Sequence, residues 1–399
     1  MKCIQTFCLI ALFFLVCAMI FPCVVHAQTI LGQSCAITGP TSFLGTEMRR
    51  GAKAYFDRYV NNVSLNTRDD QYEPDQCITN TKAFIKENVT ALFGYVGTPT
   101  SKVALPLATQ NKVIYFGAFT GASFISDYKS HPYSFSIRGS YNAEIENMVR
   151  RLKEDLNITK IGLFVQRDAY GLAGVRGAVR AVKAIEGVRI IPQVPKIPDD
   201  SASKADWDKF WRFVPNYKRN TVAVGQGARQ VSGNGVEAVI LIGAYRPCAA
   251  AINLWHKLGF NVPFINISFV GSKDLAKRLK TFNNVYVSQV MPDPWNANVP
   301  IVKEYQHAMG DGNFGFVSLE GYIAAKVFYE ALQSAGSSID SDTLKQAIES
   351  MSDFDIGGLR ISFGPKDHRG MDEVYLTKIE KTNKGPHFRY LERLSKPKE

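Results

Sequence analysis

The chain alternates between short apolar runs and longer stretches with helical spacing from residue 29 to residue 290, and this alternation constrains the fold most. The run at 161–165 is apolar throughout, which is typical of a parallel strand covered on both faces. A helical stretch reaching to about residue 184 follows it, and most of the other runs are followed in the same way. This pattern predicts an α/β fold built from doubly wound parallel sheets.

Two blocks of this alternation, roughly 29–138 and 140–290, are about equal in length and predict two lobes. Helices predicted at 299–309, 319–335 and 341–351 must return to the first block, and a β-rich tail follows them. We expect one lobe at 28–138 plus 291–356 and the other at 139–290 plus 357–399. Several connections would leave a cleft between the carboxyl ends of the two sheets, where small ligands bind in open α/β folds.

Residues 195–234 interrupt this pattern. They contain Trp207, Trp211 and Phe213 among many charged residues, and a glycine-rich stretch at 225–235 follows. A single loop of that length would be unusual in a compact domain. We predict a short helix over 205–213 with a loop after it.

The first 27 residues have the pattern of a secretory signal peptide. Lys2 precedes an apolar run at 7–21, Pro22 breaks the run, and Val25 and Ala27 occupy the −3 and −1 positions of a cleavage site. We expect cleavage after Ala27 and a mature protein in the periplasm or outside the cell. An uncleaved anchor helix is the alternative.

Four of the seven cysteines belong to this segment, so Cys35, Cys77 and Cys248 remain after cleavage. In an oxidising compartment this odd number allows one disulfide at most. A Cys35–Cys77 disulfide and three buried free thiols are both compatible with the sequence.

The charge and the motifs of the chain argue against several functions. The net charge is +11, yet no basic block with interleaved aromatic residues indicates nucleic-acid binding. The chain has no P-loop, GxSxG elbow or CxxC pair, and none of its six histidines stands at metal-ligand spacing. We therefore expect no enzyme activity, no cofactor and no bound metal.

The stretch 94–121 contains the candidate ligand site. An apolar run ends at Phe93, and Thr98 and Pro99 then match the N-cap and the first position of a helix. A second strand at 113–116 ends in the small turn 117–121, which we expect to open another helix. Helix N-termini carry free N–H groups and partial positive charge, so two of them at one sheet edge predict an anion-binding cradle. Two ordinary turns that contact no ligand are the alternative.

A series of motifs extends along the chain. AITGPTSFLG, DDQYEP, GYVGTPTS and GAFTGAS lie in the first block, RDAYG and GAYRP in the second, and SQVMPDPW and SLEGYIAAKVFYEAL follow. Their order and spacing resemble the periplasmic solute-binding proteins of ABC transporters, in the branch related to leucine/isoleucine/valine-binding proteins, over nearly the whole mature chain. The resemblance implies a type I fold with two lobes, three crossings and hinge closure on a ligand.

The resemblance also assigns ligand-binding roles to positions in the first lobe. Thr98, Thr120 and the backbone N–H of Ala118 match the groups that hold an amino acid's carboxylate. Phe43 and Leu44 match positions of the pocket for the ligand side chain. The carboxylate assignment agrees with the cradle expected from the residues themselves.

In the second lobe, Tyr170 and Tyr245 match aromatic residues that close onto the ligand. Ser268 matches the position where amino-acid binders carry an acid that pairs with the ligand ammonium, and no acid follows in the sequence until Asp274. Asp168 and Glu320 are the alternative sources of the missing charge.

These features predict a non-enzymatic, monomeric solute-binding protein outside the cytoplasm. It would capture a small carboxylate or amino-acid-like ligand between its lobes and deliver it to the permease of an ABC importer. Because a buried ammonium needs a paired charge, Ser268 favours a carboxylate or amide ligand without an obligatory α-ammonium. A ligand sensor that feeds a receptor or kinase partner is the alternative.

Overall fold

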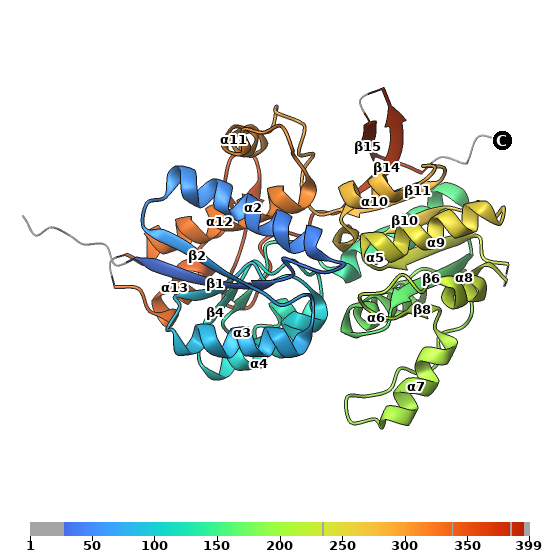
Figure 1. Cartoon of the computed structure of the whole chain (residues 1–399), viewed down its shortest axis with the longest axis horizontal. Helices are drawn as coiled ribbons and strands as arrows, with labels where there is room; N and C mark the ends of the chain where they lie inside the picture. The colour runs from blue at the N-terminus through green and yellow to red at the C-terminus, as the bar shows by residue number, and fades with distance from the viewer. Residues whose placement is uncertain (1–27, 234, 337, 384, 395–399) are drawn as a thin grey trace, which may run out of the picture.

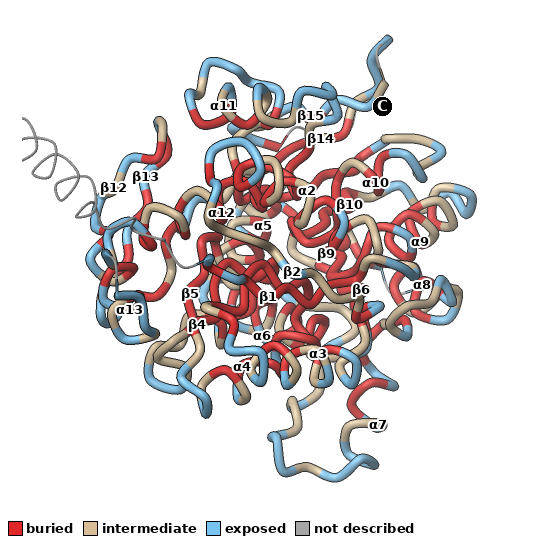
Figure 2. The backbone as a smooth tube through the Cα atoms, turned by 60° about the vertical axis from the view of Figure 1, so that its left-hand side comes forward, coloured by how far each residue is buried: buried red, intermediate tan, exposed pale blue. Residues whose placement is uncertain are grey.

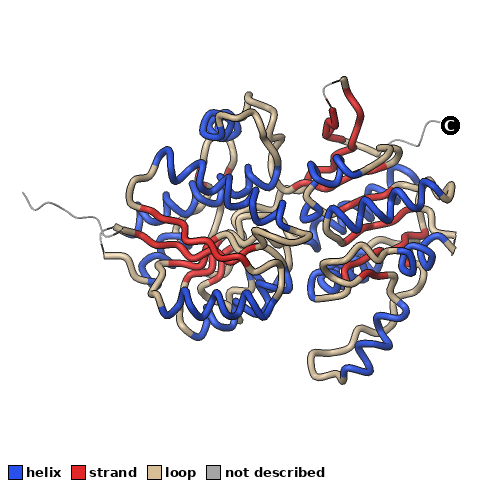
Figure 3. Tube along the Cα trace, in the orientation of Figure 1, coloured by secondary structure: helices blue, strands red, loops and turns tan. Residues whose placement is uncertain are grey.

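The computed structural model describes residues 28–394 apart from 234, 337 and 384, so the predicted signal peptide lies outside the described residues. Two sheets form the centres of two lobes (Figure 1). The first sheet has the strand order β2-β1-β3-β4-β5, and the second has the order β15-β14-β11-β10-β9-β6-β7, with β8 paired to β6. Helices cover both faces of each sheet (Figure 3), which confirms the predicted doubly wound α/β fold.

In the first lobe, all paired strands of the sheet run parallel. Helices α2 and α12 lie against each other at two glycines, where a Cβ on Gly51 would stand 1.8 Å from the carbonyl oxygen of Ser318, and one on Gly321 2.2 Å from that of Met48. The elements are β1 (Thr29–Cys35), α2 (Ser42–Tyr59), β2 (Val63–Asp69), α3 (Pro74–Lys86), β3 (Ala91–Phe93), α4 (Thr98–Gln110), β4 (Ile114–Phe116), η1 (Ser123–Ser126), β5 (Ser134–Phe135), α11 (Pro300–Met309), α12 (Phe316–Ala335) and α13 (Ser341–Glu349).

In the second lobe, the central strand β6 is packed on both faces. Phe164 contacts Trp255 of α9 on one face, and Gly171 of α6 lies against Val165 on the other. The elements are α5 (Tyr141–Leu156), β6 (Lys160–Gln166), α6 (Ala169–Ala184), β7 (Arg189–Ile190), α7 (Lys204–Phe213), β8 (Asn216–Tyr217), α8 (Gly225–Ser232), β9 (Ala238–Ile242), α9 (Tyr245–Lys257), β10 (Phe264–Asn266), η2 (Ser268–Val270), α10 (Ser272–Arg278), β11 (Val285–Gln289), β14 (Tyr375–Thr382) and β15 (Gly385–Leu391).

Three segments connect the lobes: from β5 to α5, from β11 to α11, and from the small pair β12 (Phe354–Asp355) and β13 (Arg360–Ile361) to β14. Before it reaches β14, the third segment packs on the first lobe, where Ser136 pairs with Arg369 and Phe363 contacts Phe135. Figure 2 shows buried backbone concentrated in the two sheets, whereas the projecting α7 region is largely exposed.

The cradle predicted at 94–121 differs from the structure in two details. Helix α4 begins at Thr98 itself, and its N-cap is Gly97, whose φ of 112° favours glycine. Thr98 therefore does not cap the helix. The turn 117–121 leads only to the short 3₁₀ helix η1, so the stretch 94–121 contains one α-helix N-terminus, that of α4, and not two.

Other local expectations also differ. The predicted loop after α7 contains β8 and the helix α8. Cys35, Cys77 and Cys248 are buried free thiols, so Cys35 and Cys77 form no disulfide. Within the part of the chain that the structure describes, no helix has the length and apolar character needed to cross a membrane.

Candidate functional site

The eight predicted ligand-binding residues lie at or near the carboxyl ends of strands in both lobes, which is where open α/β folds bind ligands. Phe43 is half-buried and the other seven are buried. The structure places them in four neighbouring groups: Thr98, Ala118 and Thr120; Tyr170; Tyr245, Phe43 and Leu44; and Ser268.

Thr98, Ala118 and Thr120 lie together on the first lobe. Strands β3 and β4 are adjacent and parallel, so the segments that follow them leave the sheet at the same edge. The hydroxyls of Thr98 and Thr120 are 2.8 Å apart, and Thr120 also accepts a hydrogen bond from the Ala122 N–H at 3.3 Å. The Ala118 N–H donates to no described residue. This group offers hydroxyl and amide donors to an anionic oxygen.

Tyr170 belongs to an aromatic cluster that joins the two lobes. Its ring centroid lies 4.6 Å from that of Phe269 and 5.5 Å from that of Tyr141. Phe269 also contacts two rings of the first lobe, Phe119 at 5.3 Å and Tyr72 at 6.1 Å. These separations are in the range where aromatic pairs attract each other. Phe269 of the second lobe is therefore packed against rings of both lobes.

Tyr245, Phe43 and Leu44 form a second contact between the lobes. The rings of Phe43 and Tyr245 meet edge to face at 5.8 Å, and the Phe43 N–H donates to the Tyr245 hydroxyl at 3.4 Å. A Cβ added to Gly271 would lie 2.7 Å from Cδ2 of Leu44. The N-terminal turn of α2 thus packs against the starts of α9 and α10.

Ser268 lies in a buried charge cluster centred on Arg138. Arg138 stands in the first crossing and is fully buried, and its guanidinium donates to the Ser268 hydroxyl. The guanidinium also lies 3.3 Å from Oε1 of Glu320 and 3.8 Å from Oε1 of Glu144. Glu144 in turn accepts hydrogen bonds from the Ser268 N–H and hydroxyl, both at 2.8 Å, and from the Ser288 hydroxyl.

Several polar atoms of this cluster are buried without a hydrogen bond to any described residue. They are Nε and Nη1 of Arg138, Oε1 of Glu320 and the hydroxyl of Tyr141. An unsatisfied buried polar group costs about 1–3 kcal/mol, so these atoms are available to a polar ligand. Burial raises the pKa of Glu320 to about 7, and Arg138 opposes this rise.

A family model of periplasmic binding proteins matches residues 30–385. The chain belongs to the periplasmic binding protein family. The fold is similar to that of a possible leucine/isoleucine/valine-binding protein from Rhodopirellula baltica SH 1, at 31% identity over 92% of this chain and 98% of that chain, with a TM-score of 0.79. No curated protein sequence matches the chain.

Two more distant structures share the fold. LivJ, a branched-chain amino acid transporter substrate-binding protein from Streptococcus pneumoniae in complex with isoleucine, has 13% identity over 91% of this chain and 100% of that chain, with a TM-score of 0.71. A fatty acid ABC transporter substrate-binding protein from Thermomonospora curvata has 18% identity over 92% and 93%, with a TM-score of 0.71.

Periplasmic binding proteins bind ligands and are not enzymes, and they act outside the cytoplasm. The ligand-binding components of ABC transporters are among the similar structures. Within the described residues, no group of three or more His, Cys, Asp or Glu side chains is placed to hold a metal ion.

One expectation about the site of this periplasmic binding protein is wrong. The sequence suggested that no acid lies near Ser268, but Glu144 contacts it from 124 positions earlier in the chain. The sequence contained one signal for a buried acid: Arg138 stands in the mostly uncharged segment SFSIRG, and a lone charge in a buried strand needs a buried partner. Of the two alternative acids, Glu320 lies beside Arg138, whereas Asp168 caps α6 by accepting a hydrogen bond from the Tyr170 N–H.

A clasp, formed by Arg219 and Asn220 of the second lobe and the turn 71–73 of the first, joins the two lobes. Arg219 pairs with Glu73 at 2.6 Å and with Asp168 of its own lobe at 3.3 Å. Asn220 donates to Glu73 at 2.7 Å and to the carbonyl oxygen of Gln71 at 3.1 Å. The segment between α7 and α8, which the sequence left as a loop, therefore supplies contacts between the lobes.

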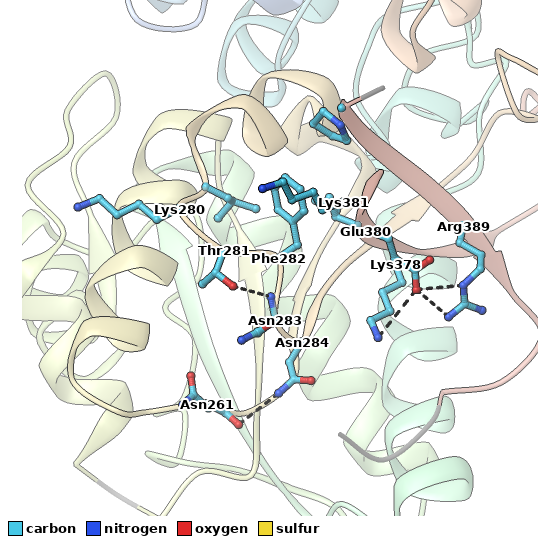
Figure 4. A pocket seen from close by; sticks show the side chains of 14 residues that line it. Asn261, Lys280, Thr281, Phe282, Asn283, Asn284, Lys378, Glu380, Lys381 and Arg389 are labelled. Carbon is cyan, nitrogen blue, oxygen red and sulfur yellow. Dashed lines mark hydrogen bonds and ion pairs between the residues drawn. The ribbon is translucent and has the colours of Figure 1, made fainter. Parts of the chain in front are cut away.

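A cavity of about 1160 Å³ lies away from the candidate site, beside the β14–β15 hairpin (Figure 4). The acid in its lining is already paired, since Glu380 contacts Arg389 at 3.0 Å and Lys378 at 4.0 Å. None of its lining side chains contains a buried polar atom without a partner. The buried polar atoms without a hydrogen bond around Arg138 therefore mark the site between the lobes as the better candidate.

We expect the Arg219→Gln variant to bind its ligand more weakly, because it loses an ion pair that only the closed arrangement provides. A partly exposed ion pair contributes about 1 kcal/mol, which corresponds to a roughly fivefold rise in Kd. Calorimetry and stopped-flow measurements should place the change in the dissociation rate. Arg167→Gln is the matched control, because Arg167 pairs with Asp208 inside the second lobe. Equal affinities for both variants would show that the clasp does not hold the lobes together.

Proposed function

We propose that this periplasmic binding protein captures a small carboxylate or amide that lacks an obligatory α-ammonium group. The mature chain, cleaved after Ala27, would work as a monomer in the periplasm or outside the cell. It would close its two lobes on the ligand and deliver it to the permease of an ABC importer.

The observation that carries this proposal is the position of Arg138 against Ser268. At the place where amino-acid-binding relatives carry an acid, this chain has a hydroxyl that accepts a hydrogen bond from a buried guanidinium. Glu144 is engaged by Ser268, Ser288 and Arg138, and Glu320 faces Arg138. Because Arg138 already pairs with both acids, a ligand ammonium placed here would have to compete with a buried guanidinium for them, and this competition disfavours its binding.

The donors of Thr98, Ala118 and Thr120 on the first lobe support a ligand that carries a carboxylate or amide oxygen. Thr98 and Thr120 share one hydrogen bond between them, and the Ala118 N–H has no acceptor among the described residues. We propose that these donors, with the start of α4, hold the ligand oxygen, because N–H groups at a helix start favour anions. Tyr170, Tyr245, Phe43 and Leu44 would enclose the apolar part of the ligand.

The names of similar structures are compatible with either ligand class. One neighbour is described in complex with isoleucine, and another is named for fatty acids. Both are too distant in sequence to transfer a ligand to this chain. The ligand class therefore rests on the chain's own residues, above all on Arg138 and Ser268.

We expect amino acids to bind more weakly than their deaminated analogues. Calorimetry with leucine against 4-methylpentanoate, and with phenylalanine against 3-phenylpropanoate, tests this directly. The carboxylate in each pair should bind more tightly, because the analogue keeps the carboxylate and does not bring an ammonium beside Arg138. Tight binding of an amino acid that is lost in its deaminated analogue would contradict the ligand class.

We expect Thr120→Val to lower the affinity for the carboxylate by about 1.5–3 kcal/mol, the range for hydrogen bonds to charged groups. The substitution removes the hydroxyl and keeps the shape of the side chain. Thr79→Val is the matched control, because Thr79 is exposed on α3 and bonds only the carbonyl oxygen of Asp75. A Kd equal to that of the control, with folding verified by circular dichroism, would place the carboxylate elsewhere.

A further inference from the structure

A second cavity, of about 420 Å³, lies between the lobes beside the candidate site. The first lobe contributes α4, the segment around η1 and His131, and the second contributes the start of α5, the stretch 169–180 of α6 and Asp200. Part of its lining is apolar, with Pro106, Ala122, Phe124 and Leu172. Because both lobes form its walls, the cavity is complete only when the lobes are together.

The rim of this cavity is strongly basic. Arg176 and Arg180 lie four residues apart on α6, so they share one face of the helix. Lys102 of α4 lies on the opposite lobe, and the only acid of the lining, Asp200, is 4.0 Å from Lys102. The described residues provide no ion-pair partner for Arg176 or Arg180. Two like charges at this spacing repel each other, so an anion between them and Lys102 would be stabilised.

The inner wall of the cavity belongs to the proposed carboxylate site. Tyr141 lines the cavity, is 1% exposed, and has a hydroxyl without a hydrogen-bond partner among the described residues. Burial raises the pKa of Tyr141 to about 12, although Arg138 and the hydroxyls of Thr120 and Thr98 oppose the rise. Ala122, also in the lining, donates its N–H to Thr120. The Tyr141 side chain thus lies between the hydroxyls of Thr98 and Thr120 and the basic cavity.

We infer that the ligand is an elongated molecule with an anionic group at each end, of which an α,ω-dicarboxylate is the simplest form. This inference rests on the proposed function, since one carboxylate of the ligand would bind at the site formed by Thr98, Ala118 and Thr120. The apolar chain of the ligand passes Tyr141 and lies along Ala122 and Leu172. The distal carboxylate reaches Arg176 and Arg180, with Lys102 on the facing lobe.

The experiment is calorimetry of succinate, adipate and suberate, each against the monocarboxylate of equal length: butyrate, hexanoate and octanoate. The wild-type protein should bind at least one dicarboxylate about tenfold or more tightly than its monocarboxylate, because charge-assisted hydrogen bonds to arginine are strong. The Arg176→Gln/Arg180→Gln variant should lose this preference and keep the monocarboxylate affinity. Both residues are exposed, so the fold should tolerate the change.

Arg229→Gln is the matched control, because Arg229 is an exposed arginine on α8 outside the cavity lining. It should keep the wild-type preference. Equal binding of dicarboxylate and monocarboxylate by the wild type would overturn the inference and leave the proposed function intact. A preference that persists in the double variant would overturn the assignment to Arg176 and Arg180. Failure of every carboxylate to bind would overturn the proposed function as well.

Discussion

The arrangement of the two lobes depends on one fully buried charge, that of Arg138 in the first crossing. Removing a guanidinium from water costs several kcal/mol unless it is paired and hydrogen-bonded. Its partners come from both sides, with Glu320 on α12 of the first lobe and Ser268 and Glu144 in the second. Separating the lobes would break this network, so the charge cluster helps to fix where they meet.

The aromatic rings and the clasp act on the same closed arrangement from other directions. Phe269 packs against rings of both lobes, and Arg219 and Asn220 hold the turn that carries Tyr72. The Tyr72 hydroxyl also accepts a hydrogen bond from Gln166 of the second lobe at 3.2 Å. Residues far from Thr98 and Thr120 can therefore change the affinity for the ligand by changing the fraction of molecules in which the lobes are closed.

Much of the fold could be predicted from the sequence because its signals are local. Apolar runs such as 161–165 define parallel strands, and glycine, proline and hydroxyl residues mark the turns between them. The side-by-side position of Thr98 and Thr120 also follows from two adjacent parallel strands. The error at Thr98 was one of a single residue, since Gly97 could supply the positive φ that the N-cap requires there.

The partners within the charge cluster and the clasp could not be identified from the sequence, because they are far apart in the chain. Glu144 and Ser268 are separated by 124 positions, and Asn220 and Glu73 by 147. No periodicity or spacing encodes such pairs, which appear only when two lobes are folded and brought together. The short strand β8 and helix α8 were not predicted for another reason. The composition of this segment is polar and glycine-rich, which is typical of a loop.

Small-angle X-ray scattering is the most direct test of whether the two lobes close around a small carboxylate. The radius of gyration should be measured without ligand and with a saturating concentration of the carboxylate that binds most tightly in calorimetry. We predict a smaller radius of gyration with the ligand, because the ligand supplies partners for the buried polar groups that both lobes share. A radius that does not change under saturating ligand would contradict closure of the lobes on the ligand.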